Sequence, residues 1–392
     1  MKILICHNYY QIPGGEDNVF KNESFLLEQR GHQVFHYIKD NKIITQKNFL
    51  RLAFDTIFNR KVYNELKNIL EEIQPDIVHF HNTFPLISPS AYYAVKKLRI
   101  PVIQTLHNYR LLCINGYLYR EGAVCELCIR KKFKWPGLLY KCYRDNIFAS
   151  FAVVLMLFIH NILKTWGKVD QFIVLSQFEK SKFIQSGFPE NKITIKYNSY
   201  KKACKHAKAS DKYILYSGRL SEEKGIFTLL DSLKYTKNIQ LKISGTSIIF
   251  DEIQNKISSN SLQNVHILGQ LSYGDNLQIL SQAYILIYPS HLFEAMSLSI
   301  IEAFANGIPV IASNHGSMAE LVTHNETGLL FETGNPKDLA KKINWANNHP
   351  KEIKEMGKNA KIEFYRKYTE EISYQKLMTI YNSAIQLNKR GK

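Results

Sequence analysis

The chain has 392 residues, of which 45% are hydrophobic and 22% are charged. These values are ordinary for a globular protein, and the length is sufficient for two hydrophobic cores. They exclude an intrinsically disordered chain and a fibrous protein.

The formal net charge of +17 narrows the choice of partner. Excess positive charge suits nucleic acid, anionic lipid headgroups or phosphorylated small molecules. The sequence has no aromatic RNP pattern, zinc finger or basic zipper. We therefore expect no nucleic-acid partner and favour an anionic membrane surface.

The first ten residues, MKILICHNYY, have one lysine followed by a strand pattern. They lack the long apolar stretch and the small-residue cleavage site of a secretory signal peptide. Six cysteines in a cytosolic chain of this size are expected to be reduced. We therefore predict a cytoplasmic protein, peripheral at the inner face of the cell membrane.

Strand patterns alternate with helical patterns along the first half of the chain. The expected strands are residues 2–6, 33–38, 75–79, 100–106, 171–175 and 192–197. Residues 17–30 and 88–98 have helical periodicity, whereas residues 40–60 are polar and show no clear pattern.

Polar residues follow three of these strands: Gly14 with Gly15, His79 with His81, and His107. A strand, a glycine turn and a helix start can form an anion site from backbone N–H groups, but a tight turn favours glycine without any ligand. A lone histidine is usually structural. Its position at the carboxyl end of a strand favours a functional role for His107.

An insertion is expected at residues 109–146, which contain Cys113, Cys125, Cys128 and Cys142. Only one CxxC is present, so a four-thiolate zinc site and a set of idle buried thiols both remain open.

Residues 147–163 are the most apolar segment of the chain and are flanked by basic residues. The segment is shorter than the roughly 20 residues that cross a bilayer. It fits either a helix at a membrane surface or a helix in the core.

A basic segment, residues 200–211, is interpreted as a linker between two domains. Strand patterns then return at residues 213–217, 242–244, 265–268, 285–288, 310–312 and 329–331. Two such arrays predict two doubly wound α/β domains that face a cleft.

Charged residues gather at the carboxyl ends of strands in the second half. Arg219 and Lys224 follow the strand 213–217, and both cations can converge on one phosphorylated group. Glu294 follows the strand 285–288, and Glu302 lies in a predicted helix, residues 297–306. Open α/β sheets bind their ligands at this edge.

These motifs, in this order, resemble the retaining, nucleotide-sugar-dependent glycosyltransferases of family 4. The resemblance is carried by Gly14-Gly15, His107, Gly218-Arg219 with Lys224-Gly225, and Glu294-x7-Glu302. It covers nearly the whole chain and is strongest from residue 213 to residue 334.

The resemblance implies the GT-B fold, with two Rossmann-like domains. It places an acceptor-side domain at residues 1–203, a nucleotide-sugar domain at residues 204–366, and a final helix at residues 367–392 that returns to the first domain. It also implies that no catalytic metal or other cofactor is needed beyond the nucleotide-diphosphate sugar.

The same resemblance implies roles for single residues. Gly218, Arg219 and Lys224 would hold the diphosphate, and Glu302 would accept from the ribose hydroxyls. Glu294 would contact the donor sugar, with backbone N–H groups of Ala295, Met296, Ser297 and Leu298 near the phosphate and sugar. His107 would touch the transferred sugar, and Gly15 would let the first domain approach the phosphates.

The chain departs from the family pattern at three places, one of which is Asn108, where an Asp commonly follows the histidine. Ala295-Met296-Ser297 stands where many relatives have Gly-Phe-Gly, and Asn198-Ser199 stands where Asn-Gly is usual.

The expected activity is retaining transfer of a sugar to a saccharide or lipid-linked saccharide in O-antigen, capsule or exopolysaccharide synthesis. The alternatives are a GT-B nucleotide-sugar epimerase or phosphorylase, and a scaffold that keeps the fold without catalysis.

Overall fold

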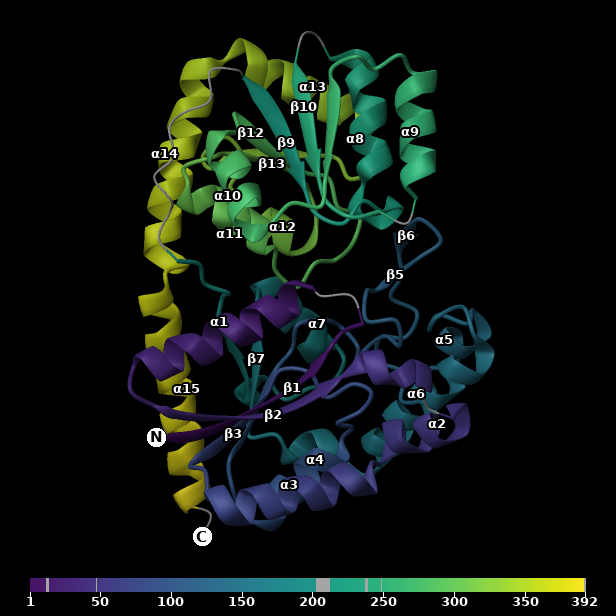
Figure 1. The fold of residues 1–392 in the computed structure, drawn as a ribbon, viewed down its shortest axis with the longest axis vertical. Helices are drawn as coiled ribbons and strands as arrows, with labels where there is room; N and C mark the ends of the chain where they lie inside the picture. The colour runs from purple at the N-terminus through teal and green to yellow at the C-terminus, as the bar shows by residue number, and fades with distance from the viewer. Residues whose placement is uncertain (12–13, 47, 202–211, 237–238, 248, 391–392) are drawn as a thin grey trace. The chain divides into compact units, whose positions relative to one another are not determined.

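The structure is a computed structural model that describes the chain except for residues 12–13, 47, 202–211, 237–238, 248 and 391–392. The predicted linker, residues 200–211, therefore lies mostly outside the described residues. The chain separates into two compact units (Figure 1). Unit 1 contains residues 1–118, 125–197 and 373–392, and unit 2 contains residues 119–124 and 198–372.

Unit 1 is built on a six-stranded sheet whose strands are all parallel. The strands are β1 Lys2–Tyr9, β2 Gln33–Asp40, β3 Ile77–Phe80, β4 Val102–Thr105, β7 Gln171–Val174 and β8 Ile193–Ile195. Their order in the sheet is β2-β1-β3-β4-β7-β8. The strand predictions for this half are confirmed, and β1 extends three residues further because its pairing with β2 continues to Tyr9 and Asp40.

The helices of unit 1 cover this sheet. They are α1 Gly15–Gln29, η1 Asn41–Gln46, α2 Phe49–Ile57, α3 Arg60–Ile73, α4 Ser90–Lys97, α5 Trp135–Leu139, α6 Ile147–Ile162, η2 Thr165–Lys168, α7 Gln177–Gln185, η3 Glu190–Lys192 and α15 Glu370–Arg390. Leu377, Ile380 and Tyr381 of α15 pack in one core cluster with Ile3 and Ile5 of β1, so the end of the chain belongs to the hydrophobic core of this unit.

Residues 40–60, which the sequence pattern left unplaced, contain the helix α2. Its first turn is capped by Asn48, whose side chain accepts a hydrogen bond from the backbone N–H of Leu50. The helix α2 contacts α6. No helix among the described residues is long and apolar enough to span a membrane.

The insertion after β4 contains a small antiparallel hairpin, β5 Tyr119–Arg120 and β6 Ala123–Val124, that the sequence did not predict. This hairpin groups with unit 2, whereas the rest of the insertion groups with unit 1. Among the described residues, the four cysteines of the insertion do not form a group of thiols at metal-ligand distances.

Unit 2 has a second parallel sheet of six strands. The strands are β9 Tyr213–Ser217, β10 Gln240–Ser244, β11 Val265–Gly269, β12 Ile285–Tyr288, β13 Val310–Ser313 and β14 Gly328–Phe331. Their order, β11-β10-β9-β12-β13-β14, is that of a Rossmann fold. Each predicted strand of this half is present, within two residues at either end.

The helices of unit 2 are η4 Glu222–Lys224, α8 Ile226–Ser232, η5 Leu233–Tyr235, α9 Phe250–Ser259, α10 Tyr273–Gln282, α11 Leu298–Ala305, α12 Gly316–Leu321, α13 Pro336–Asn348 and α14 Pro350–Lys367. In Figure 1 they lie on both faces of the sheet. The core is formed largely by branched side chains of the central strands and of α8, α13 and α14.

Candidate functional site

The strand order of unit 2 reverses between β9 and β12. The chain leaves β9 toward β10 on one side, and β12 lies on the other side of β9. At such a point the loops that follow the two strands diverge and leave a crevice at the carboxyl ends. The loop after β9 contains Gly218, Arg219 and Lys224, and the loop after β12 contains Glu294.

A close backbone approach joins these two loops. Gly225 has φ +76°, and a Cβ atom at this position would lie 1.8 Å from the carbonyl oxygen of Pro289. Only glycine fits this conformation and this distance. Gly225 therefore lets the segment after β9 pack directly against the segment after β12.

Lys224 and Glu294 form an ion pair across this contact. The Nζ atom of Lys224 is 2.5 Å from Oε1 of Glu294, and the hydroxyl of Ser290 donates to the same oxygen at 2.7 Å. Both side chains are mostly buried, with 22% and 15% of their surfaces exposed. The structure thus brings together two residues that the sequence predicted for the same site.

The pair is held in its charged form. Burial alone would raise the pKa of Glu294, but Lys224, Ser290 and Tyr288 bring it below its usual value. Burial would lower the pKa of Lys224, but the carboxylate of Glu294 raises it above its usual value. At neutral pH the crevice therefore contains an ammonium and a carboxylate in contact.

Arg219 lies beside this pair and is more accessible. Its guanidinium donates to Oε1 of Glu223 at 2.7 Å, and 45% of its side chain is exposed. Its carbonyl oxygen accepts from the hydroxyl of Tyr216 at 2.7 Å, which fixes the backbone. Each of the two predicted phosphate ligands therefore contacts a carboxylate in the structure.

Glu302 has a different environment from Glu294. It lies on α11, is 8% exposed, and accepts from the hydroxyl of Tyr273 at 3.3 Å. Burial raises the pKa of Glu302 to about 7, and the hydrogen bond from Tyr273 opposes only part of that effect. The two glutamates thus have opposite pKa shifts, because only Glu294 has a cation beside it.

The segment between these glutamates is fixed by side chains that differ from the family pattern. The backbone N–H of Asn198 donates to Sδ of Met296 at 3.2 Å, so two of the three departures found in the sequence contact each other. Ser297 caps α11 by accepting from the N–H of Ile300. Ala295 is buried, and Leu298 begins the helix.

Unit 1 has its own polar cluster at the carboxyl ends of β1 and β3, where its strand order also reverses. His79 and His81 are two residues apart and lie on the same side of the strand. Oε1 of Glu23, from α1, is 3.3 Å from Nδ1 of His79 and 3.2 Å from Nε2 of His81. Oε2 of Glu23 accepts from Lys196 at 2.6 Å.

His107 extends this cluster by one residue. Its Nε2 atom is 3.0 Å from Nδ1 of His81, and the two rings stack with centroids 5.2 Å apart. Burial, followed by the charge of His81, lowers the pKa of His107 well below its usual value. His107 is therefore a neutral imidazole at pH 7, with its orientation set by His81.

The three side chains Glu23, His79 and His81 have metal-ligand spacing, with ligand atoms within 4.8 Å of one another. The ammonium of Lys196, however, contacts the carboxylate of Glu23, and hydroxyls of Tyr381 and Thr105 bond both ring nitrogens of His79 at 2.7 Å. Burial would raise the pKa of Glu23, but Lys196, His81 and His79 together bring it well below its usual value. The donor set fits a hydrogen-bonded network better than a cation site.

The glycine turn of unit 1 is stabilised by acidic side chains. Gly15 begins α1, and Asp17 accepts from the N–H of Gly14 at 3.0 Å and bonds His7 at 2.8 Å. Glu16 accepts from the hydroxyl of Tyr10 at 2.7 Å, and burial raises the pKa of Glu16 to about 8. Glu16 and His107 line a cavity of about 50 Å³ together with Asn108, Arg110 and Met156.

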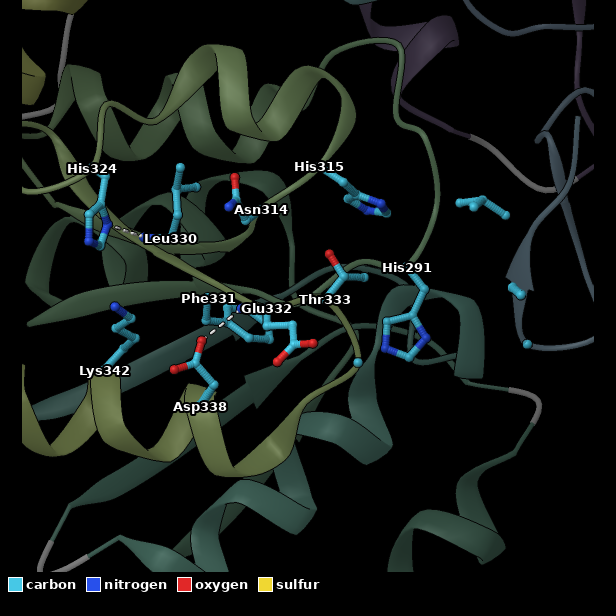
Figure 2. A pocket seen from close by; sticks show the side chains of 14 residues that line it. His291, Asn314, His315, His324, Leu330, Phe331, Glu332, Thr333, Asp338 and Lys342 are labelled. Atoms are coloured by element: carbon cyan, nitrogen blue, oxygen red, sulfur yellow. Dashed lines mark hydrogen bonds between the residues drawn. The ribbon is translucent and has the colours of Figure 1, made fainter.

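Unit 2 contains a larger pocket of about 930 Å³, which is adjacent in the chain to Glu294. Figure 2 shows His291, His315 and Thr333 toward one side, and His324, Asp338 and Lys342 toward the other. His315 bonds the carbonyl oxygen of Ser290 at 3.1 Å, which connects the pocket wall to the loop of the ion pair.

The chemistry of this pocket is polar and nearly neutral. Burial lowers the pKa of His291, His315 and His324, so the three rings carry no charge at pH 7. Glu332 and Asp338 supply two negative charges and Lys342 one positive charge. Such groups suit a ligand rich in hydroxyls better than a strong anion.

Sequence reasoning missed Glu23, Lys196 and this pocket. The alternation His79-x-His81 was the available indication that two imidazoles share one side of a strand. The sequence does not reveal that α1 and the segment after β8 meet there, because that depends on the strand order.

Comparisons with known proteins cover almost the whole chain. The profile described as Glycosyltransferase Family 4 matches residues 13–200, and the profile described as Glycosyl transferases group 1 matches residues 201–363. An uncharacterized glycosyltransferase of Methanocaldococcus jannaschii is 25% identical over 389 residues, covering 97% of this chain and 98% of that protein.

Two further proteins are similar over most of their length. The capsular polysaccharide biosynthesis glycosyltransferase CapM of Staphylococcus aureus is 26% identical over 350 residues, covering 82% of each chain. The crystal structure of Anabaena HepE in complex with UDP superposes with a TM-score of 0.70 at 18% identity, covering 98% of this chain and 100% of that one.

Proposed function

We propose a donor, a mechanism and an acceptor class for this chain, which belongs to the family 4 glycosyltransferases and has the GT-B fold predicted from its sequence. Because the chain belongs to this family, it is an enzyme that transfers glycosyl groups. The observation that carries the rest is the contact between Lys224 and Glu294 at the reversal of the unit 2 sheet.

The donor is a nucleotide-diphosphate sugar bound at this reversal. Lys224 and Arg219 contact the diphosphate, since both cations follow β9 at this edge of the sheet. When the donor binds, phosphate oxygens take the place of the carboxylates of Glu294 and Glu223. Glu302 accepts from the ribose hydroxyls, as carboxylates do in dinucleotide folds. The similarity to HepE, which was crystallised with UDP, supports a nucleotide-containing donor.

The remaining predicted residues surround the sugar. Glu294 accepts from sugar hydroxyls, while the backbone N–H groups of residues 295–298, at the start of α11, face the sugar and its phosphate. Gly218 lets the phosphate approach the backbone after β9. Gly15 lets the backbone of unit 1 approach the phosphates. His107, neutral and oriented by His81, contacts the transferred sugar.

The transfer retains the configuration of the anomeric carbon by a front-face displacement. The bond from that carbon to the diphosphate oxygen breaks, and a bond to the acceptor oxygen forms on the same face. The acceptor proton passes to the leaving diphosphate. Arg219 and Lys224 stabilise the charge that develops on this leaving group, so we propose that the reaction requires no catalytic metal.

The acceptor is a saccharide or a lipid-linked saccharide of a cell-surface polysaccharide. The similarity to CapM, a capsular polysaccharide biosynthesis enzyme, supports this class. The polar pocket around His291 and His315 is contiguous with the loop of Glu294, so we assign it to sugar units of the acceptor.

The experiment that tests this function is a screen of the full chain against UDP-, GDP- and dTDP-sugars by thermal shift, followed by product analysis. A donor at a hundred times its Kd raises stability by about 2.7 kcal/mol. NMR of the product with the matching donor then shows the same anomeric configuration as in the donor. An inverted product, or an isomerised donor without acceptor, would overturn the assignment.

A further inference from the structure

Three helices of unit 1, α2, α5 and α6, expose an unusual amount of apolar surface. Half of the large apolar side chains that are exposed in the described chain lie on these helices and their C-caps. Phe54 is 70% exposed, Phe148 is 68% exposed and Leu139 is 61% exposed. Scattered exposed apolar residues are normal, whereas a group of them indicates a contact surface.

The helix α6 shows how this surface arises. Val153, Val154 and Leu157 are buried in a core cluster of unit 1. Phe148, Phe151 and Ile162 follow the other side of the helix at helical spacing and are exposed. The helix is therefore apolar on both sides, but only one side has a partner within the unit.

The helices α2 and α5 widen this exposed stripe, because both contact α6. The rings of Phe49 on α2 and Phe148 on α6 lie 6.4 Å apart. Leu138 of α5 packs against the core cluster that contains the buried side of α6. Figure 1 shows the three helices side by side at one edge of unit 1, and we call their exposed side chains the apolar face.

Basic residues flank α5 and α6 in the chain. From residue 130 to residue 168 the chain has eight lysines and arginines and one acidic residue, Asp145. Lys132, Lys141 and Lys164 in this segment are exposed. Long basic side chains beside an apolar helix can reach anionic headgroups while the apolar side chains enter the acyl boundary.

We infer that the apolar face docks unit 1 onto an anionic lipid bilayer, with α6 lying in the plane of the interface. This inference rests on the proposed function in one respect: docking would give the enzyme access to a lipid-linked acceptor. The 16 residues of α6 extend about 24 Å, less than the roughly 30 Å of the hydrocarbon core, so the helix lies along the surface.

A bilayer fits this surface better than a second copy of the chain. In a symmetric dimer the same patch meets itself, so the basic rims of the two copies would face each other. Like charges brought together at an interface oppose association. Anionic headgroups instead complement the lysines.

Docking through α6 also places the lipid surface near the predicted chemistry of unit 1. Met156, on the buried side of α6, lines the cavity that contains His107 and Glu16. One side of α6 would thus contact lipid while the other forms a wall of the catalytic cavity. An acceptor anchored in the bilayer would reach His107 without leaving the surface.

The test is flotation of the full chain with vesicles of phosphatidylglycerol and phosphatidylcholine, compared with phosphatidylcholine alone. The variant Phe54→Ser with Phe148→Ser removes two exposed rings without touching the core. We expect it to lower vesicle binding at least about tenfold, since burying an aromatic ring is worth more than a factor of ten. The matched control Ile362→Ser, at a residue that is 65% exposed on α14, should bind like the original protein.

Trp135 on α5 gives a second readout, because it is 50% exposed. Its fluorescence should shift to the blue on addition of anionic vesicles, and Trp135→Phe should remove that shift. Raising the salt concentration should weaken binding, because exposed lysines are screened. Retained vesicle binding in the double variant, or an equal loss in Ile362→Ser, would overturn the inference.

Two measurements separate this inference from the proposed function. Donor-dependent thermal stabilisation should be the same in the double variant and in the original protein, because α2 and α6 lie outside unit 2. Failure of every nucleotide-sugar to stabilise the chain, with vesicle binding intact, would reject the proposed function alone. A dimer in sedimentation that the double variant dissociates, with no vesicle binding by either protein, would identify a second copy as the occupant and reject the bilayer.

Discussion

The polar cluster of unit 1 and the ion pairs of unit 2 both combine glutamates with basic side chains, but the two groups differ in their exposure to solvent. Glu23 and Lys196 are 6% and 5% exposed, and His79 and His81 beside them are 0% and 2% exposed. Arg219 and Lys224 are 45% and 22% exposed and lie at the carboxyl edge of their sheet.

This difference indicates which charges serve a ligand. A buried charge that contacts an opposite buried charge cannot give up that partner without a large desolvation penalty. A partly exposed cation paired with one carboxylate can exchange that partner for phosphate. The cluster of unit 1 therefore positions His107, whereas the cations of unit 2 are accessible enough to contact the donor that we propose.

The largest expected effect is on the stability of unit 1. Lys196→Met leaves the carboxylate of Glu23 buried without its cation, which should cost about 3–5 kcal/mol, or at least about 6 °C in thermal midpoint. The matched variant Lys39→Met breaks a pair with Glu65 whose side chains are 26% and 31% exposed, and it should shift the midpoint by much less. Equal shifts of the thermal midpoint in the two variants would show that buried and accessible ion pairs contribute equally to stability.

The next effect is on catalysis. Lys224→Ala should lower kcat/KM about 10²- to 10³-fold, because the ammonium no longer stabilises the leaving diphosphate. Lys256→Ala removes the ion pair with Asp231 in the same unit, where the side chains are 31% and 28% exposed, and should leave kcat/KM unchanged. Steady-state kinetics with saturating acceptor measures both, and an unchanged kcat/KM for Lys224→Ala would place the diphosphate elsewhere.

A smaller effect concerns the pH dependence of donor binding. Glu302 has a pKa raised to about 7, and only its carboxylate can accept from both ribose hydroxyls. The Kd of the nucleotide-sugar should therefore rise about tenfold as the pH falls from 8 to 6. Calorimetry with Glu302→Gln is the control, and it should show weak binding that does not depend on pH. A tenfold change that persists in Glu302→Gln would have to come from another group.

The smallest effect is expected at Arg219. Its guanidinium is nearly half exposed and already shares its charge with Glu223, so Arg219→Lys keeps the charge and loses only the two-pronged geometry. We expect kcat/KM to fall about three- to tenfold, less than for Lys224→Ala. If Arg219→Lys lowers kcat/KM as much as Lys224→Ala does, the exposed fraction of a cation does not predict its contribution to catalysis.

The fold was predictable from the sequence to a large extent. All twelve expected strands are present, because buried parallel strands are short apolar runs that end at polar loops. The helix α2 was missed although Phe49, Leu50 and Phe54 lie at helical spacing, because it has only nine residues and lies within the segment 40–60, which is polar elsewhere. The hairpin β5–β6 has only two residues in each strand, too few for any periodicity.

The residues of the candidate site were predictable only where a short stretch of sequence, such as a loop after a strand, identifies them. Lys224 and Glu294 were identified from loops that follow two strands, and the strand order then explains their contact. The partners Glu23 and Lys196 lie 173 residues apart in the chain. Their pairing depends on where α1 and the end of β8 lie in space, which no local pattern contains.

The most direct test of the central claim is calorimetric titration of the full chain with the nucleotide-sugar found by the screen. We predict one donor per chain, with a Kd at least about a hundredfold weaker in Lys224→Ala and unchanged in Lys256→Ala. If the original protein binds no nucleotide-sugar, or if Lys224→Ala binds it equally well, the crevice between β9 and β12 is not the donor site.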